Sequence, residues 1–268
     1  MEKSCLAFVL PVFFAVCAWG ADASAPLPQR QPAHGGVYVV AHRGAHEGIP
    51  ENTLAAYAKA IELGCDFVEV DLRTTRDGHI VSVHNAEVND YTRDARGPVS
   101  DFTLAELKAM DIGSRIGPEW SNERIPELEE ILSLCAGKIG LYVDLKNAPV
   151  ERVAARLKAH GMQRDAVWYA SVSNLRKLAE ACPECVPMPD PGTEKGLERV
   201  LKAVKTGVIA SSYGNLSREF VEAADRAGVV MIVDDDGPEG WGPMVEWGVR
   251  GIQTDQPAKL IGWLDNRK

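Results

Sequence analysis

The chain has 268 residues, of which 46% are hydrophobic and 25% are charged, and its formal net charge is −9. This composition excludes a disordered or fibrous protein, because enough apolar side chains are present to bury a sizeable core. The acidic balance and the thin spread of 29 Lys and Arg residues argue against a nucleic-acid-binding surface, which needs clustered basic side chains. A small molecule is the expected partner.

The first two dozen residues differ from the rest of the chain. Lys3 precedes an apolar run at 5–19, and small residues follow at 20–24. This order is typical of a secretory signal peptide, whose apolar centre is short for a membrane span. We therefore expect residues 1–23 to be a signal peptide, and the protein to be exported to the periplasm or secreted without stable membrane insertion.

Residues 24–36 are rich in Pro, Gln and Ala and show no periodicity, which is typical of a flexible lead-in. No comparable linker recurs, so residues 37–268 are expected to form one domain. Within this domain Cys182 and Cys185 are a close pair. We expect a structural disulfide or free thiols there, since no second cysteine or histidine pair stands nearby to complete a zinc site.

Short β-branched runs alternate with amphipathic helical patterns along residues 37–268. The expected strands are 37–41, 66–72, 80–84, 139–145, 166–170, 186–189, 208–211, 229–233 and 251–254. The expected helices are 53–63, 104–110, 126–135, 150–160, 174–182, 196–204, 218–227 and 243–247. Repeated β-then-α order implies parallel strands with crossover helices, and the domain is close to the roughly 250 residues of a typical barrel. We predict a single-domain α/β protein, a (β/α)8 TIM barrel; a doubly wound open sheet is the alternative.

Nine strands are one too many for such a barrel. The turn at 76–78 contains Asp-Gly between two apolar runs, which is a strong hairpin signal. It predicts that the second and third strands pair locally, outside the alternating pattern. The alternative is that one of the nine runs is a loop.

The second expected strand carries charged residues on one face, since strand residues two apart point to the same side. That face contains Cys65, Phe67, Glu69 and Asp71. If the opposite, apolar side packs on helices, both carboxylates point into the barrel near the end where barrel enzymes keep their active sites. The same alternation places Asp144 and Lys146 on the inner face of the strand at 139–145.

Further polar side chains stand at the ends of neighbouring strands. His42 and Arg43 close the first strand, and His84 closes the third. Three carboxylates suit one hard divalent cation, Mg²⁺ or Ca²⁺, and two histidines suit acid–base work near neutral pH. Arg43 and Lys146 complement an anionic phosphoryl group. The set predicts cleavage of a small-molecule phosphodiester, and the alternative is a buried structural network of ion pairs.

These residues lie in motifs that resemble those of the glycerophosphodiester phosphodiesterase family. The matching pieces are His-Arg-Gly at 42–44, Glu-Asn at 51–52, Glu-Val-Asp at 69–71, His84, Asp-Leu-Lys at 144–146 and a closing Thr-Asp-Gln-Pro at 254–257. The resemblance implies a (β/α)8 barrel with a divalent metal and release of an alcohol and glycerol 3-phosphate. It implies an acid–base pair (His42, His84), metal ligands (Glu69, Asp71, Asp144) and residues around the phosphate (Arg43, Lys146, Glu51).

Two further positions, within and beside these motifs, have roles that need no catalytic function. Asn52 or Thr53 is expected to cap the helix that follows. His46 is near enough to be a candidate for substrate contact, although a loop histidine needs no such role.

The chain departs from the family pattern at three places. Asp144 replaces the usual Glu, and Asn85 replaces the Asp that normally follows the second histidine. The family's late Trp-Thr-x-Asn appears as Met-Ile-Val-Asp, so Asp234 takes the Asn position and an aromatic wall is missing. Trp241 is a candidate to replace that wall from a loop.

The first hypothesis is therefore an exported, metal-dependent phosphodiesterase acting on glycerophosphodiesters, with His42 favoured as base and His84 as acid. A second hypothesis keeps the chemistry but takes lysophospholipids or sphingolipids, as phospholipase D-type toxins do. A third is a catalytically weak phosphate-binding barrel, motivated by Asn85 and the lost Trp. No oligomeric state is predicted.

Overall fold

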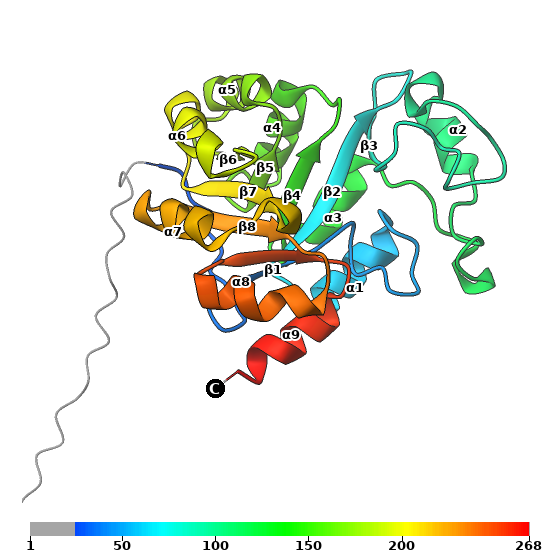
Figure 1. Cartoon of the computed structure of the whole chain (residues 1–268). Coiled ribbons are helices and arrows are strands. Elements are labelled where there is room, and N and C mark those ends of the chain that lie inside the picture. The colour runs from blue at the N-terminus through cyan, green and yellow to red at the C-terminus, as the bar shows by residue number, and fades with distance from the viewer. Residues whose placement is uncertain (1–24, 268) are drawn as a thin grey trace, which may run out of the picture.

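The computed structural model describes residues 25–267, so the predicted signal peptide lies outside the described residues. The described chain forms a nearly closed barrel of eight parallel strands that alternate with outer helices (Figure 1). The predicted (β/α)8 barrel is confirmed.

The elements follow the predicted order with ends displaced by a few residues. The strands are β1 (Tyr38–Ala41), β2 (Phe67–Thr74), β3 (Ile80–Ser82), β4 (Gly140–Leu145), β5 (Ala166–Tyr169), β6 (Val186–Met188), β7 (Val208–Ser212), β8 (Val230–Asp234) and β9 (Gly251–Thr254). The helices are α1 (Leu54–Leu63), α2 (Leu104–Ala109), α3 (Leu128–Cys135), α4 (Val150–Ala159), α5 (Val172–Ala181), α6 (Glu194–Ala203), α7 (Arg218–Arg226), α8 (Trp241–Trp247) and α9 (Pro257–Asp265). Four short 3-10 helices are Val99–Asp101, Pro118–Trp120, Tyr213–Asn215 and Pro238–Gly240. Helix α9 was missed by the sequence patterns, although Pro257 in its first turn is a start signal.

The parallel strands follow the order β6-β5-β4-β2-β1-β9-β8-β7. The two end strands of this order meet where Ala210 N donates to Pro189 O at 3.0 Å, which closes the ring. Strand β3 instead pairs antiparallel with β2, so the predicted Asp-Gly hairpin is confirmed and accounts for the ninth strand. The segment after β3, which carries α2, projects to one side of the barrel (Figure 1).

Two apolar layers follow from the alternation along the strands. Val68, Val70 and Leu72 of β2 pack outward against the helices, as predicted. Phe67 points inward and packs with Tyr38 and Tyr142 in the barrel interior. This inner cluster fills the barrel beneath the charged ends of the strands, so the site has an apolar floor.

Cys65 was expected on the inner face with Phe67, and this expectation is wrong. It packs in the outer core instead, because β2 begins only at Phe67 and the strand alternation does not extend back to Cys65.

The described part of the expected lead-in lies along the amino-terminal end of the barrel. Gln29 N donates to Arg164 O at 2.9 Å, the Arg30 guanidinium lies 3.1 Å from Asp165, and Ala33 N donates to Asp66 Oδ1 at 2.9 Å. Between α5 and β6, Cys182 and Cys185 form a disulfide and both are buried. No helix of residues 25–267 is both long enough and apolar enough to cross a membrane.

Candidate active site at the carboxyl ends of the strands

A cavity opens at the carboxyl ends of the barrel strands, and most of the predicted site residues lie around it. Six of them line it: His42, Arg43, Glu69, His84, Asp144 and Lys146. Asp71 is fully buried and is not among the residues that line the cavity. Glu51 stands behind Arg43, with its carboxylate oxygens 3.3 and 3.4 Å from the guanidinium, and is not among the residues that line the cavity.

Three carboxylates converge because β2 and β4 are adjacent and in register. Asp71 pairs directly with Asp144 across the two strands, and Glu69 lies one inward-facing position before Asp71. Oxygen atoms of all three carboxylates lie within 4.8 Å of one another. Burial and the nearby charge of Asp71 raise the pKa of Glu69 to about 8, and burial also raises the pKa of Asp144. Burial and mutual repulsion thus disfavour the ionised forms of these carboxylates when no cation is bound.

One ammonium group balances part of this charge. Lys146 Nζ lies 2.6 Å from Asp144 Oδ2 and 3.1 Å from Asp71 Oδ1. The second of these contacts lacks the alignment of a hydrogen bond, and Asp71 Oδ1 accepts none, although it is buried. A donor set made only of carboxylate oxygens, with one ammonium group bound to two of the three carboxylates, fits a hard divalent cation.

Asn52 supports this cluster, and of the two residues expected to cap the helix that follows, Thr53 is the one that does. Its amide Nδ2 donates to Asp71 Oδ2 at 2.8 Å, while its Oδ1 accepts from the hydroxyls of Tyr57 and Ser82 at 2.9 Å each. Thr53 is the cap of α1, because its hydroxyl accepts from Ala56 N. The side chain of Asn52 thus sets the orientation of the Asp71 carboxylate.

The His-Arg-Gly loop after β1 is held in a strained conformation. Arg43 and Asn52 both have positive φ, at 53° and 54°, and Asn52 N donates to Arg43 O at 2.9 Å. Gly44 has φ 90°, and a Cβ there would lie 2.6 Å from Ala56 Cβ, so only glycine lets the loop pack on α1. This geometry directs Arg43 N to Glu69 Oε2 at 2.9 Å.

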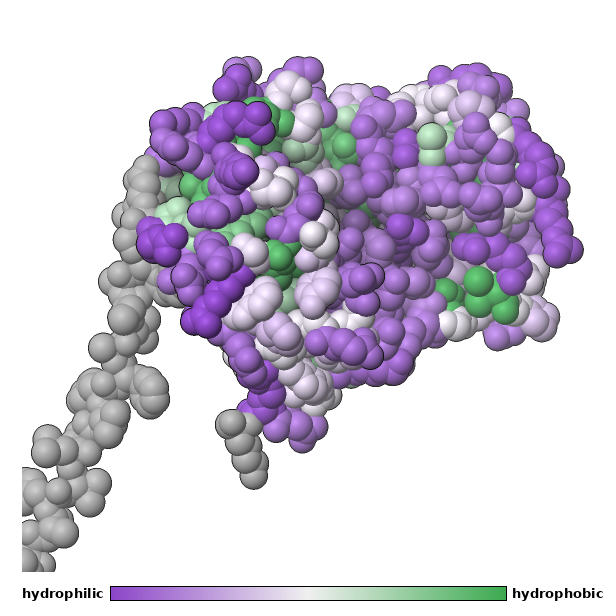
Figure 2. Space-filling view, viewed as in Figure 1, coloured by the Kyte–Doolittle hydropathy of each residue, from purple (hydrophilic) through white to green (hydrophobic). Residues whose placement is uncertain are grey.

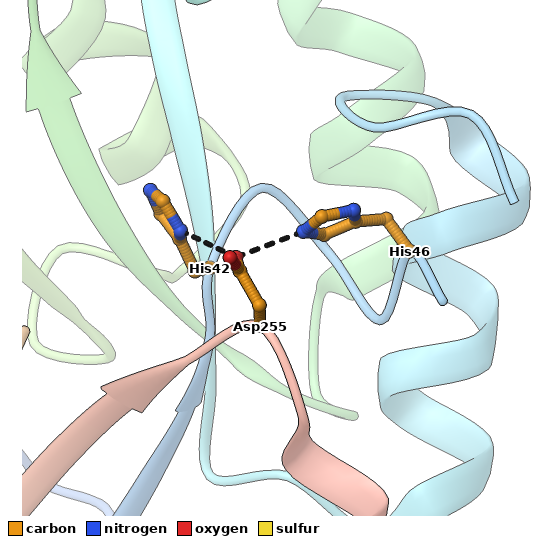
Figure 3. A group of neighbouring side chains, drawn as sticks. All are labelled: His42, His46 and Asp255. Carbon is orange, nitrogen blue, oxygen red and sulfur yellow. Dashed lines mark hydrogen bonds and ion pairs between the residues drawn. The ribbon is translucent and has the colours of Figure 1, made fainter. Parts of the chain in front are cut away.

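His42 is oriented by a residue that sequence reasoning did not single out. Its Nδ1 lies 2.7 Å from Asp255 Oδ1 (Figure 3). Its Nε2 lies 3.5 Å from Glu69 Oε2. Because an ionised carboxylate only accepts hydrogen bonds, Nδ1 carries a proton and Nε2 is left for other partners. Burial alone lowers the pKa of His42, but the Asp255 hydrogen bond and the charges of Glu69 and Asp234 raise it to about 9. Asp255 belongs to the Thr-Asp-Gln-Pro motif, which was the signal available for it.

His84 is oriented in a similar way by a neutral side chain. It stands two residues beyond the end of β3, where the Arg73 guanidinium donates to its carbonyl oxygen at 2.6 Å. His84 Nδ1 lies 2.9 Å from Asn85 Oδ1, and Asn85 Nδ2 donates to Asp90 Oδ2 at 2.7 Å. Asn85 therefore preserves a hydrogen bond to His84, although its side chain is a neutral amide where the family pattern has a carboxylate. No sequence pattern singled out Arg73 or Asp90.

The expected aromatic replacement by Trp241 is wrong. Trp241 is the first residue of α8 and is buried, with its ring 5.8 Å from that of Trp263 in α9 and its Nε1 donating to Asp235. The aromatic lining of the cavity comes instead from Tyr142 and Tyr169, whose rings lie 6.2 Å apart. Asp234 lines the cavity opposite them, as its position in the motif implied, and burial raises its pKa.

Comparison with known proteins agrees with this arrangement. The sequence model of the glycerophosphoryl diester phosphodiesterase family matches residues 42–181, which include the two histidines and the three carboxylates. A glycerophosphodiester phosphodiesterase of Caldanaerobacter subterraneus is 32% identical over 244 residues, spanning 83% of this chain and 96% of the relative. The chain belongs to the glycerophosphoryl diester phosphodiesterase family.

Solved structures extend the match to the whole fold. A phosphodiesterase of Oleispira antarctica, solved in complex with the product sn-glycerol-3-phosphate, superposes with a TM-score of 0.78 at 26% identity, covering 85% of this chain and 97% of that one. A glycerophosphodiester phosphodiesterase of Agrobacterium tumefaciens gives a TM-score of 0.74 at 26% identity, covering 84% of this chain and 99% of that one. As a member of this family, the chain is a phosphodiester hydrolase.

Proposed function

We propose that the chain hydrolyses glycerophosphodiesters to an alcohol and glycerol 3-phosphate, using one divalent cation and the two histidines. One observation carries this proposal: three buried carboxylates from β2 and β4 converge beside two imidazoles whose Nδ1 atoms are both engaged. The product complex of the Oleispira antarctica phosphodiesterase supports the choice of substrate class.

The proposed cation ligands are Glu69, Asp71 and Asp144. Mg²⁺ or Ca²⁺ is preferred, because every donor in the set is a carboxylate oxygen. When bound, the cation supplies positive charge that stabilises the phosphoryl oxygens as charge builds on them, and that opposes the raised pKa of the neighbouring His42.

The two histidines divide the proton transfers. In the neutral imidazole of His42, Nδ1–H donates to Asp255 and the lone pair is on Nε2, so this atom removes a proton from the nucleophile, either water or a neighbouring hydroxyl of the substrate. His84 is held through the amide of Asn85 rather than through a carboxylate. We assign the acid role to His84, which donates a proton to the leaving alcohol oxygen.

The cationic side chains complete the phosphate site. Arg43 and Lys146 line the cavity on the side of the carboxylates, and both are partly buried. Their charges stabilise the negative charge on the phosphoryl oxygens during attack, and the partial burial strengthens that interaction relative to bulk water. Glu51 holds the Arg43 guanidinium from behind and so acts on the phosphate through it.

Water-soluble diesters are favoured over lysolipids as substrates. Hydrophilic residues cover most of the face seen in Figure 2. Among the described residues, the exposed large hydrophobic side chains are Leu27 and Ile116, at 44% and 43% exposure. Two separate side chains provide no apolar surface for docking on a membrane.

The test is a substrate panel with the mature protein. Glycerophosphocholine, glycerophosphoethanolamine and lysophosphatidylcholine are incubated with and without a chelator, and released glycerol 3-phosphate and choline are measured. We expect glycerol 3-phosphate from the first two substrates, loss of activity on chelation and recovery with Mg²⁺ or Ca²⁺. Choline released from the lysolipid alone would favour the phospholipase D-like hypothesis, and no turnover of any diester would favour a phosphate-binding barrel.

Cation binding is checked separately by thermal unfolding. Mg²⁺ or Ca²⁺ is expected to raise the melting temperature of the chelator-treated protein, because a ligand that binds the folded state stabilises it. Glu69→Gln should abolish this rise. Glu62→Gln, an exposed change of the same type on α1, should keep it.

We also propose that the protein is exported. The sequence pattern of residues 1–23 supports this, and so does the disulfide of Cys182 and Cys185, since such bonds persist in oxidising compartments. Cell fractionation followed by N-terminal sequencing tests it. A mature protein that begins near residue 21 or 24 outside the cytoplasm is expected, and an unprocessed cytoplasmic chain would contradict it.

A further inference from the structure

Asp255 accepts two hydrogen bonds on one oxygen atom, and the second donor has no role in the mechanism above. Oδ1 lies 2.7 Å from His42 Nδ1 and 2.9 Å from His46 Nε2. Figure 3 shows Asp255 between the two imidazoles, with His46 coming from the loop after β1 and Asp255 from the segment after β9. The three side chains form a continuous His–Asp–His chain at the rim of the site.

The second donor matters because Asp255 is open to solvent. Its side chain is 59% exposed, whereas those of His42 and His46 are 18% and 23% exposed. An exposed carboxylate held by a single hydrogen bond can rotate and exchange that bond for water, which costs little free energy. A second imidazole on the other side of the same oxygen restricts this rotation. The loop has a further tie to α9, since Lys259 Nζ lies 3.4 Å from Glu47 Oε1.

Direct contact of His46 with the substrate is not favoured by its position. His46 is not among the residues that line the cavity, and its ring centre lies 6.5 Å from that of His42. Its Nε2 is already engaged by Asp255, on the side of the carboxylate opposite to His42 (Figure 3).

A metal ion at this cluster is the competing interpretation. The ligand atoms of His42, His46 and Asp255 lie within 4.8 Å of one another. An ion there would need the lone pair of His42 Nδ1, so the imidazole proton would have to move to Nε2. Both observed distances, 2.7 and 2.9 Å, are instead normal hydrogen-bond lengths.

We propose that His46 is a positioning residue that acts through Asp255. It holds the carboxylate against His42 Nδ1, so that His42 keeps its Nδ1 proton and presents Nε2 to the reaction. This inference rests on the proposed function of His42.

The experiment compares four variants: His46→Leu, His46→Gln, Asp255→Asn and the double variant of His46→Leu with Asp255→Asn. Glycerophosphocholine turnover is measured for each, with kcat and KM determined separately. His46→Leu should lower kcat about tenfold with little change in KM, a size typical of lost outer-shell support. His46→Gln should recover most of the loss, because its amide nitrogen can donate to Asp255 from nearly the same place.

The double variant decides whether His46 acts through Asp255. Asp255→Asn should cost more than His46→Leu, and adding His46→Leu to it should cost little more, since residues in one network are not additive. If the losses in kcat of the two single variants multiply in the double variant, the proposal is overturned. A change in His46→Leu that is confined to KM would also overturn it, because that result indicates contact of His46 with the substrate. Unchanged kcat in His46→Leu would also overturn it.

Nitrogen-15 NMR of the imidazoles separates this proposal from the proposed function. The wild type should show a protonated, hydrogen-bonded His42 Nδ1, and this signal should weaken in His46→Leu and return in His46→Gln whether or not any diester is turned over. An unaltered His42 signal in His46→Leu contradicts the positioning role. Thermal unfolding checks that each variant is folded. Inhibition by micromolar zinc that His46→Leu abolishes would replace the proposal by a metal site.

Discussion

Strand β2 has one buried carboxylate just before its first residue and others toward its carboxyl-terminal end, and the two groups have different partners. Asp66, just before the strand, accepts hydrogen bonds from Ala33 N at 2.9 Å and Val39 N at 2.8 Å. Burial raises the pKa of Asp66, and these two amides oppose the rise. Asp71, near the other end, faces Glu69 and Asp144 across distances at which carboxylates repel.

We interpret this difference as the contrast between a structural charge and the proposed cation ligands. At the amino-terminal end, backbone amides repay the cost of burying a charge, so Asp66 ties the lead-in and β1 to β2. At the carboxyl-terminal end, Lys146 and Asn52 offset only part of the cost of three neighbouring carboxylates, which is consistent with the proposed cation site. Substitutions at the two ends of β2 should therefore affect different quantities.

The largest effect is expected from Asp71→Asn. It should lower kcat/KM about a thousandfold, because the variant removes one charge from the proposed cation site. The melting temperature of the chelator-treated variant should equal or exceed that of the wild type, since a repulsion is removed. A strong loss of stability in Asp71→Asn would make both ends of β2 structural and remove the contrast.

His42→Ala and His84→Ala should each lower kcat by at least about a hundredfold, as expected when a general acid or base is lost. Steady-state kinetics on glycerophosphocholine measures the change, and circular dichroism checks the fold. His79→Ala is the matched control, since this exposed histidine pairs only with Glu127 and should leave kcat unchanged. Equal activity in all three variants would contradict the acid–base assignment.

Asp66→Asn should have the opposite effect to Asp71→Asn: it should lower stability and leave kcat unchanged. We expect a loss of about 2 kcal/mol in the free energy of unfolding, because the amide nitrogen that replaces one carboxylate oxygen cannot accept the backbone hydrogen bond made at that position. Urea unfolding measures the loss. At a temperature where the variant is folded, kcat should match the wild type, and a lower kcat would mean that this end of β2 also serves the reaction.

Asn85→Asp should change the reaction by less than about fivefold at its optimum pH. The new carboxylate would face His84 Nδ1 and favour its protonated form. If His84 is the acid, the alkaline limb of the pH–rate profile should move to higher pH. A shift of the acidic limb alone would instead make His84 the base.

The smallest effect is expected at His34, beside Asp66 at the amino-terminal end. Burial lowers the pKa of His34, but the hydrogen bonds with Asp265 and Gly64 O outweigh it and leave the pKa raised. The charged imidazole therefore stabilises the fold below its unfolded pKa of about 6.5, and this stabilisation is lost as pH rises through the folded value. His34→Gln should lower the melting temperature by about 1–2 °C near pH 5.5 and leave it unchanged near pH 9, since solvent screens the pair. A pH-independent difference would show that packing, not charge, is lost.

Local patterns in the sequence were sufficient to predict the barrel and the strand positions of most of the candidate site residues. The two-residue alternation of β2 and β4 directed Glu69, Asp71 and Asp144 inward, and the Asp-Gly turn predicted the β2–β3 hairpin. Each of these predictions depends only on residues close together in the sequence. Side chains alternate between the two faces of a strand, and this alternation does not depend on distant parts of the chain.

The tertiary structure alone decided which distant side chains support these residues. His42 and Asp255 are 213 positions apart, and they meet because β1 pairs with β9 with Ala41 opposite Thr254. Packing of the loop after β1 likewise brought Asn52 to Asp71, and the contact between α8 and α9 placed Trp241 against Trp263, away from the cavity. A periodic pattern shows which way a side chain points, but its partner across the barrel depends on strand order and register, which no local pattern encodes.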